Sequence, residues 1–318
     1  MQMRTLLLAA ALVLTAAQLR AEETDPVMKV TLLGTGTPAV RPHRLGPATL
    51  VEAGEEVLLF DAGRATTLRL RQAGIPLGSV DELFITHLHS DHVIGLPDLW
   101  LTGWVMGRQE VPLRIRGPKG TRALLEGLRA AYDYDIRIRQ EAGPKLPAAG
   151  MAIAVEEIGP GVVYEAAGVR VTAFEVDHGP IKPAFGFRVD YKGRSVVLSG
   201  DTRYSENLVA AAKGADVLIH EVAYASPEQA RNRFWRGVIS THTLPDDAAR
   251  VFNATEPGIA VFNHIVTREP GNDCDALRDT RAAYEGDVRL GEDLMRIDIA
   301  ADGTLSVDSP ECGGCSQP

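Results

Sequence analysis

One stretch of this chain, Thr86-His87-Leu88-His89-Ser90-Asp91-His92, places three imidazoles and a carboxylate within six positions. His and Asp are seldom buried without a partner, so packing alone does not explain the stretch. His87 and His89 are two apart and point the same way in an extended loop, whereas Asp91 and His92 are consecutive and diverge. One short loop can therefore serve two metal ions about 3.5–4 Å apart, the separation typical of two-metal hydrolases.

The loop follows a short apolar run, 81–86, that reads as a buried strand. Two further predicted strands end in residues of the same chemistry. The strand over 169–176 precedes His178, and the strand over 195–199 precedes Asp201. A cap for a helix over 205–213 is the alternative role of Asp201. Strand ends would hold these side chains on a rigid base.

These residues resemble the metallo-β-lactamase superfamily, whose signature His-x-His-x-Asp-His stands here as His87, His89, Asp91 and His92. The resemblance covers almost the whole chain after residue 21. It implies an α/β fold, namely the four-layer αββα sandwich. It also implies two ligand sets: His87, His89, His178 and Asp201 on one ion, and Asp91, His92, Asp201 and His264 on the other. Nitrogen and oxygen ligands without Cys suit two zinc ions, with manganese and iron as alternatives.

Three other segments resemble the ribonuclease Z-like branch of that superfamily: a Gly34-Thr35-Gly36 turn, the pair His220-Glu221, and Ser240-Thr241-His242-Thr243. The resemblance implies that Glu221 orients His242, which acts as general acid on the leaving group or as an oxyanion stabiliser. Asp91, His242 and Glu221 are thus the expected catalytic residues. The alternative for His242 is a histidine of a helix-capping region, before a helix over 245–253 with Thr243 as its N-cap.

The implied reaction is hydrolysis by a metal-bridging hydroxide, because two ions lower the pKa of a bridging water from about 15.7 towards 7. Ribonuclease Z carries a long basic arm that grips transfer RNA, where this chain has only residues 190–194. We therefore expect an arylsulfatase- or phosphodiesterase-like enzyme for small sulfate esters or phosphodiesters. Trp100 and Trp104 are candidate walls of an apolar pocket, and their alternative is the core. The alternative functions are a ribonuclease Z-type endonuclease in 3′ tRNA processing, a lactonase or β-lactamase, and a non-enzymatic metal-binding scaffold.

Residues 1–21 have the pattern of a signal peptide, with Arg4 before an apolar run of about a dozen residues. The run is short for a membrane span, although a retained anchor is the alternative. We expect a periplasmic or secreted protein. Without Arg4 and Arg20 the formal charge falls from −9 to about −11, which argues against a nucleic-acid substrate.

Residues 22–310 are expected to form one hydrolase domain, followed by a flexible tail over 311–318. The tail contains Cys312 and Cys315, for which a local disulfide is expected, with a disordered tail as the alternative. Residues 132–165 are rich in charges, Pro and Gly, which favours a loop or insertion over the site. Asp61 either braces the histidine loop or caps a helix over 65–73. The sequence is compatible with a dimer.

Overall fold

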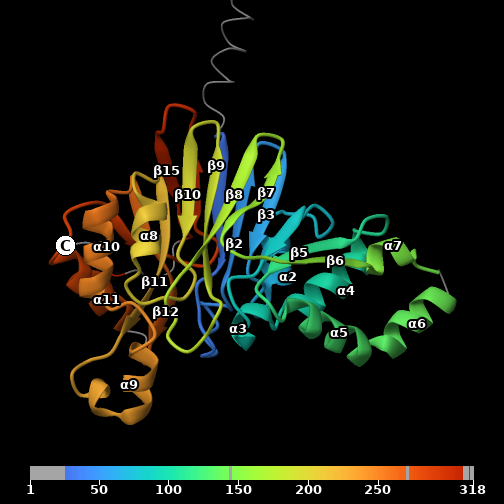
Figure 1. The fold of residues 1–318 in the computed structure, drawn as a ribbon, viewed down its shortest axis with the longest axis horizontal. Helices are drawn as coiled ribbons and strands as arrows, with labels where there is room; N and C mark the ends of the chain where they lie inside the picture. Colours follow the sequence, from blue (N-terminus) through green and yellow to red (C-terminus); the bar gives the residue numbers. More distant parts are fainter. Residues whose placement is uncertain (1–25, 143–144, 270–271, 311–314, 316–318) are drawn as a thin grey trace, which may run out of the picture.

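The computed structural model describes residues 26–142, 145–269, 272–310 and Cys315. Two large β-sheets face each other (Figure 1). The first has eight strands in the order β15-β14-β1-β2-β3-β4-β5-β6, with bounds β1 Met28–Gly34, β2 Ala48–Ala53, β3 Glu56–Phe60, β4 Glu82–Phe84, β5 Leu113–Gly117, β6 Ile153–Glu157, β14 Arg296–Ile299 and β15 Leu305–Asp308. The second has seven in the order β13-β12-β11-β10-β9-β8-β7, with bounds β7 Gly161–Ala166, β8 Val169–Glu175, β9 Phe185–Tyr191, β10 Arg194–Leu198, β11 Val217–Tyr224, β12 Ile259–Thr267 and β13 Val288–Leu290.

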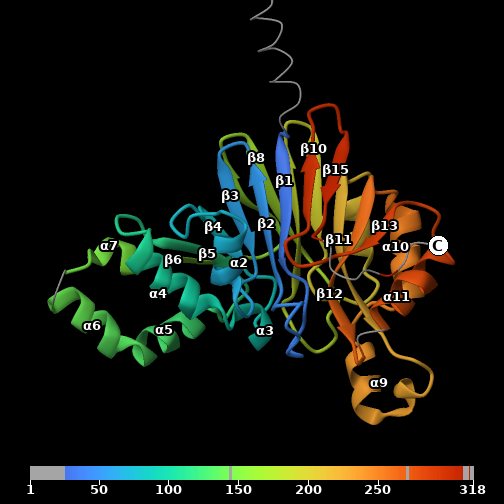
Figure 2. The same ribbon diagram turned by 180° about the vertical axis from the view of Figure 1, so that it is seen from behind.

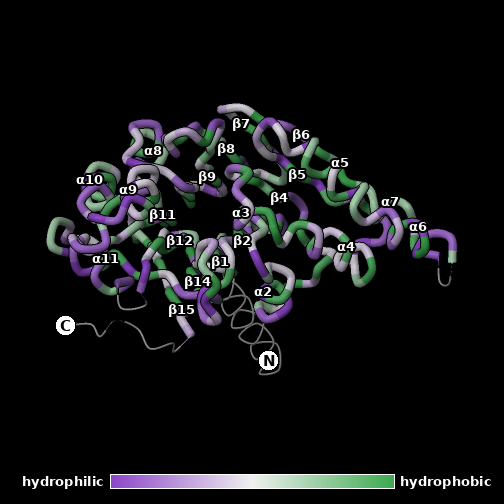
Figure 3. Tube along the Cα trace, turned by 90° about the horizontal axis from the view of Figure 1, so that it is seen from below, coloured by the Kyte–Doolittle hydropathy of each residue, from purple (hydrophilic) through white to green (hydrophobic). Residues whose placement is uncertain are grey.

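Helices cover the outer faces of both sheets, as the views in Figures 2 and 3 show. The first sheet packs against α2 (Thr66–Gln72), α4 (Leu96–Met106), α5 (Thr121–Ala131) and α7 (Ala148–Met151). The second packs against α8 (Glu206–Ala212), α10 (Pro245–Thr255) and α11 (Asn272–Arg281). The predicted four-layer αββα sandwich is therefore confirmed.

The core between the sheets forms because the inward positions of facing strands are apolar. In β8, Val169, Val171 and Ala173 are buried and alternate with residues that are not fully buried. Within the first sheet the rings of Phe60 and Phe84 stack with centroids 4.9 Å apart, and across the interface Phe187 of β9 lies 5.4 Å from Phe60 and 5.5 Å from Phe84. This packing gives the strand ends a fixed framework on which the histidine loop is built.

Two predictions about the region around the site are wrong. Residues 132–165 are not a loop over the site, because they form α6 (Asp133–Glu141), α7, β6 and most of β7. Both strands lie at an edge of their sheets, where charged side chains stay exposed. Trp100 and Trp104 belong to the hydrophobic core, which was the alternative to pocket walls. Both are fully buried, and their indole N–H groups donate to the backbone oxygens of Met151 and Pro147.

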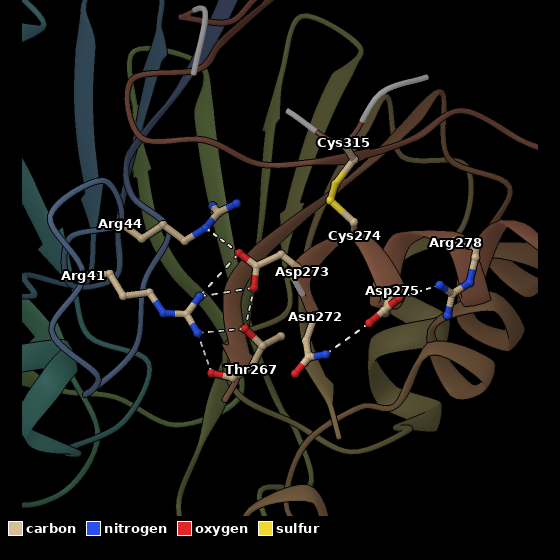
Figure 4. Close-up of a disulfide and its surroundings, with 9 residues drawn as sticks. All are labelled: Arg41, Arg44, Thr267, Asn272, Asp273, Cys274, Asp275, Arg278 and Cys315. Atoms are coloured by element: carbon tan, nitrogen blue, oxygen red, sulfur yellow. Dashed lines mark hydrogen bonds and ion pairs between the residues drawn. A yellow bond between two sulfur atoms is a disulfide. The ribbon is translucent and has the colours of Figure 1, made fainter. Parts of the chain in front are cut away.

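The cysteine prediction also needs correction, because Cys315 forms a disulfide with Cys274 of α11 and not with Cys312 (Figure 4). The two cysteines are 41 positions apart, yet their Cα atoms are 5.5 Å apart. Residue 312 itself lies outside the described residues, as do the predicted signal peptide 1–21 and, apart from Cys315, the predicted tail 311–318. Within the described part of the chain, no helix has the length and apolar character needed to cross a membrane.

Candidate metal centre

The predicted ligands lie at one end of the sandwich, where several strands end. His87 and His89 follow β4, and Asp91 and His92 belong to the short helix α3 (Ser90–Val93). Of the remaining three, His178 follows β8, Asp201 follows β10, and His264 lies within β12. His89 is exposed, whereas the other six are buried. Segments far apart in sequence thus place their polar side chains in one buried cluster.

The cluster contains three groups of candidate ligands, and within each group the ligand atoms lie within 4.8 Å of one another; the third group is Asp201, His242 and His264. The first contains His87, His89, His178 and Asp201, and the second contains Asp91, His92 and His264. Asp201 lies between them: its Oδ2 is 3.4 Å from Nε2 of His92 and 3.4 Å from Nε2 of His264. The same oxygen is 3.8 Å from Nε2 of His87. The geometry therefore brings the seven predicted ligands together, with Asp201 between the first group and the second.

The chemical state of these groups fits a divalent cation. Nε2 of His87, Nε2 of His92 and Oδ1 of Asp201 are buried, and none has a hydrogen-bond partner among the described residues. Burial lowers the pKa of His87 well below its usual range and also lowers the pKa of His178. Both rings are thus neutral, which is the form that binds a metal. Unpartnered buried acceptors are costly unless a ligand satisfies them.

Asp61 supports the histidine loop from behind. Nδ1 of His92 donates to Oδ2 of Asp61 at 2.7 Å, and the backbone N–H of Thr86 donates to Oδ1 at 2.9 Å. Because the carboxylate only accepts, it fixes the His92 tautomer with Nε2 directed to the cluster. The bracing interpretation is confirmed and the capping one is wrong, since the N-cap of α2 is Ala65.

Replacing Asp61 with Asn should weaken metal binding about 10–100-fold, because the amide no longer offers two anionic acceptors to His92 and Thr86. Competition with a chromophoric chelator would measure the change. Asp81→Asn is the matched control, since Asp81 also accepts a backbone N–H, from Val57, next to β4 but away from the cluster. Equal affinity in the two variants would contradict the bracing role.

Glu221 of β11 holds His242 beside the cluster. Oε1 of Glu221 accepts hydrogen bonds from Nδ1 of His242 at 3.2 Å and from the backbone N–H groups of Thr243 and Thr202. Burial opposes the charged imidazole, but the Glu221 carboxylate outweighs it and raises the pKa of His242 to about 9. His242 thus carries a proton at neutral pH, next to the ring of His178 at 5.1 Å between centroids.

Two threonines near the site were not predicted in their actual roles. Thr243 is not the N-cap of α10, which is Leu244; its hydroxyl instead donates to the backbone oxygen of Thr202. The backbone oxygen of Thr241 accepts from Nδ1 of His178 at 2.9 Å. The motif around His242 contains both residues, but a backbone contact across 63 positions leaves no trace in residue type.

Two facing sheets between helices, with a buried His and Asp cluster at their strand ends, define the metal-dependent hydrolases of the metallo-β-lactamase fold. Within that class, the chain belongs to the ribonuclease Z-like family, and residues 28–234 match the family model described as Anti-Pycsar protein Apyc1. Ribonuclease Z from Mycobacterium sp. (strain KMS) is 38% identical over 276 residues, covering 86% of this chain and 96% of the relative. Ribonuclease Z from Mycobacterium avium (strain 104) is 36% identical over 285 residues, covering 86% and 99%.

Solved structures agree with this assignment. The short form of human tRNase Z is 26% identical with a TM-score of 0.63, covering 85% of this chain and 98% of that protein. The metallo-β-lactamase fold protein YhfI from Bacillus subtilis has a TM-score of 0.65 at 18% identity, covering 85% and 98%, and supports the fold alone.

Proposed function

We propose that the protein is a phosphodiesterase of the ribonuclease Z type that cleaves RNA with two bound zinc ions. The observation that carries the proposal is the Glu221–His242 pair, which lies beside the cluster of candidate ligands. One ion would be held by the first group, and the other by Asp91, His92 and His264 together with Asp201. When bound, such cations polarise a phosphoryl oxygen and lower the pKa of water.

The protein's own residues supply the rest of the chemistry. With Nδ1 bonded to Glu221, the other nitrogen of His242 is available to hold a proton for the oxygen that leaves phosphorus. A leaving alkoxide needs this proton, because alcohols are much weaker acids than nitrophenols. Asp91, the other predicted catalytic residue, would act as a ligand of the second ion beside His264, whose Nε2 lies 3.2 Å from its Oδ2.

The relatives support RNA more than the sulfate esters that the sequence suggested. The connection between β9 and β10 is only Lys192-Gly193, which is shorter than the predicted 190–194. However, the alignment with the relative from strain KMS is 276 residues long and covers 86% of this chain. These two lengths are nearly equal, which leaves no room in the aligned part of that relative for a long arm between β9 and β10. Absence of the arm therefore does not separate this chain from proteins named ribonuclease Z.

Export remains our proposal from residues 1–21, to be tested by N-terminal sequencing of the secreted protein.

The test compares three substrates on zinc-loaded protein: a precursor tRNA with a 3′ trailer, bis(4-nitrophenyl) phosphate and 4-nitrophenyl sulfate. We expect cleavage at the 3′ end of the tRNA and turnover of the diester, with a lower kcat/KM on the sulfate. A preference for the sulfate would restore the arylsulfatase hypothesis. Hydrolysis of lactones or β-lactams, without turnover of either phosphodiester, would move the protein to another branch of the superfamily.

A further inference from the structure

Between β11 and His242 the chain forms a projection that we call the α9 arm, residues 226–241. It contains a 3-10 turn, η1 (Gln229–Arg231), and the helix α9 (Arg233–Ile239). In Figures 1 and 2 α9 extends beyond the sandwich at the end where α3 lies. None of the residues of α9 is buried. The arm therefore adds little to the core, and its side chains are available to a ligand.

The arm is basic on an acidic protein. It carries three exposed arginines, Arg231, Arg233 and Arg236, and a single acid, Glu228, whereas the whole chain has a formal charge of −9. Near the arm, ion pairs join His242 to Glu221 and Arg250 to Asp247. Among the described residues, no ion pair involves Arg231, Arg233 or Arg236. Their charge is left for an anionic partner.

Two aromatic rings lie among these arginines. Phe234 is 71% exposed, and Trp235, which is half-buried, stands almost perpendicular to it at 6.0 Å between centroids. An exposed aromatic side chain on a helix without buried residues gains nothing from packing. Arginines interleaved with aromatic rings are the pattern with which proteins bind single-stranded nucleic acid, by phosphate contacts and base stacking.

Both ends of the arm are fixed to the body. At its start the buried Gln229 donates to Oδ1 of Asn272 at 3.2 Å. In its middle, Oδ1 of Asn232 accepts from the backbone N–H of Phe234 and so caps α9. At its end the backbone oxygen of Thr241 accepts from His178, a candidate metal ligand. The basic and aromatic side chains therefore stand on a fixed support a few residues before His242.

We propose that the α9 arm binds single-stranded RNA next to the scissile phosphate. Phe234 stacks on a base, while Arg233 and Arg236 contact the backbone phosphates. The inference rests on the proposed function for the identity of the substrate. Within this chain the arm would supply a local basic surface that the overall charge does not reveal.

The test uses the full chain and two sets of variants matched in exposure. Phe234→Ala and the double variant Arg233→Gln/Arg236→Gln change the arm. Their controls are Tyr134→Ala and Arg137→Gln/Arg139→Gln on α6, which projects from the opposite side of the molecule (Figure 1). Tyr134 is 72% exposed, almost the same as Phe234. Fluorescence anisotropy with a labelled 12-nucleotide single-stranded RNA in EDTA measures binding without cleavage.

We expect Phe234→Ala to raise Kd about tenfold, which is within the range for losing one stacked base. The double arginine variant should reduce the slope of log K against log salt by about 1.4, since each phosphate contact contributes about 0.7 on single strands. Both α6 variants should stay within about twofold of the unaltered protein, because a base stack and phosphate contacts are lost only on the arm. With zinc present, the arm variants should lose more kcat/KM on RNA than on bis(4-nitrophenyl) phosphate.

Equal Kd values for the arm and α6 variants would overturn the proposal, even if the enzyme cleaves RNA. So would failure of the unaltered protein to bind the RNA. If the arm variants bind RNA more weakly but even the unaltered protein does not cleave it, the α9 arm is an RNA-binding surface and the proposed ribonuclease activity fails. The two proposals are thus tested separately.

Discussion

Asp201→Ala should release bound metal and abolish hydrolysis together. Oδ2 of Asp201 lies 3.4 Å from Nε2 of both His92 and His264 and 3.9 Å from Nε2 of His178, so one carboxylate serves the first and the second group of candidate ligands. Loss of a supporting residue behind a ligand typically costs 10–100-fold in affinity, so loss of this carboxylate should cost more than about 100-fold. Elemental analysis after dialysis, with kcat/KM on bis(4-nitrophenyl) phosphate, would measure both effects.

Asp308→Ala is the control for this variant, because Asp308 is exposed on the edge strand β15 and lies far from the cluster in sequence. It should retain the metal content and activity of the unaltered protein. Circular dichroism of the Asp201 variant should first establish that it is folded, because removal of one partner from a buried charged cluster destabilises a protein. Retention of two metal ions per chain by Asp201→Ala would show that Asp201 does not bridge the two groups.

The sequence was most informative where chemistry coincides with the end of an apolar strand. His87 follows a run whose residues are buried in β4, and Asp201 follows β10 in the same way. An apolar strand fixes where the chain turns, and the polar residues at that turn can be identified without knowledge of distant contacts. This is why the structure brings the predicted ligands together.

The sequence was least informative where the outcome depends on which side of an element faces its neighbours. Trp100 and Trp104 share one helical face, but only the position of α4 shows that this face packs on α7 and not on the site. Likewise, the sequence contains the segment Arg233-Phe234-Trp235-Arg236, but it does not show that the helix formed there has no buried residue. The bond from Cys274 to Cys315 joins residues 41 positions apart, and no local pattern indicates it.

His242→Ala should keep its metal but lose turnover, and the loss should depend on the leaving group. A general acid typically contributes about 10²–10⁴-fold. That contribution matters for an alcohol-like leaving group, such as the ribose oxygen of RNA, and much less for 4-nitrophenolate. We therefore expect a large loss on RNA and a small one on bis(4-nitrophenyl) phosphate. A series of aryl diesters should give a steeper dependence of log kcat/KM on leaving-group acidity than in the unaltered protein.

Metal content distinguishes this role from ligation. A nitrogen of His242 lies within 4.8 Å of ligand atoms of Asp201 and His264, so the ring is close enough to be considered a ligand itself. However, Nδ1 of His242 donates to Glu221, and neither of the two predicted ligand sets includes His242. His43→Ala, in an exposed loop, is the matched control. Loss of metal from His242→Ala would make it a ligand, whereas an equal loss of turnover on good and poor leaving groups would make it an oxyanion stabiliser.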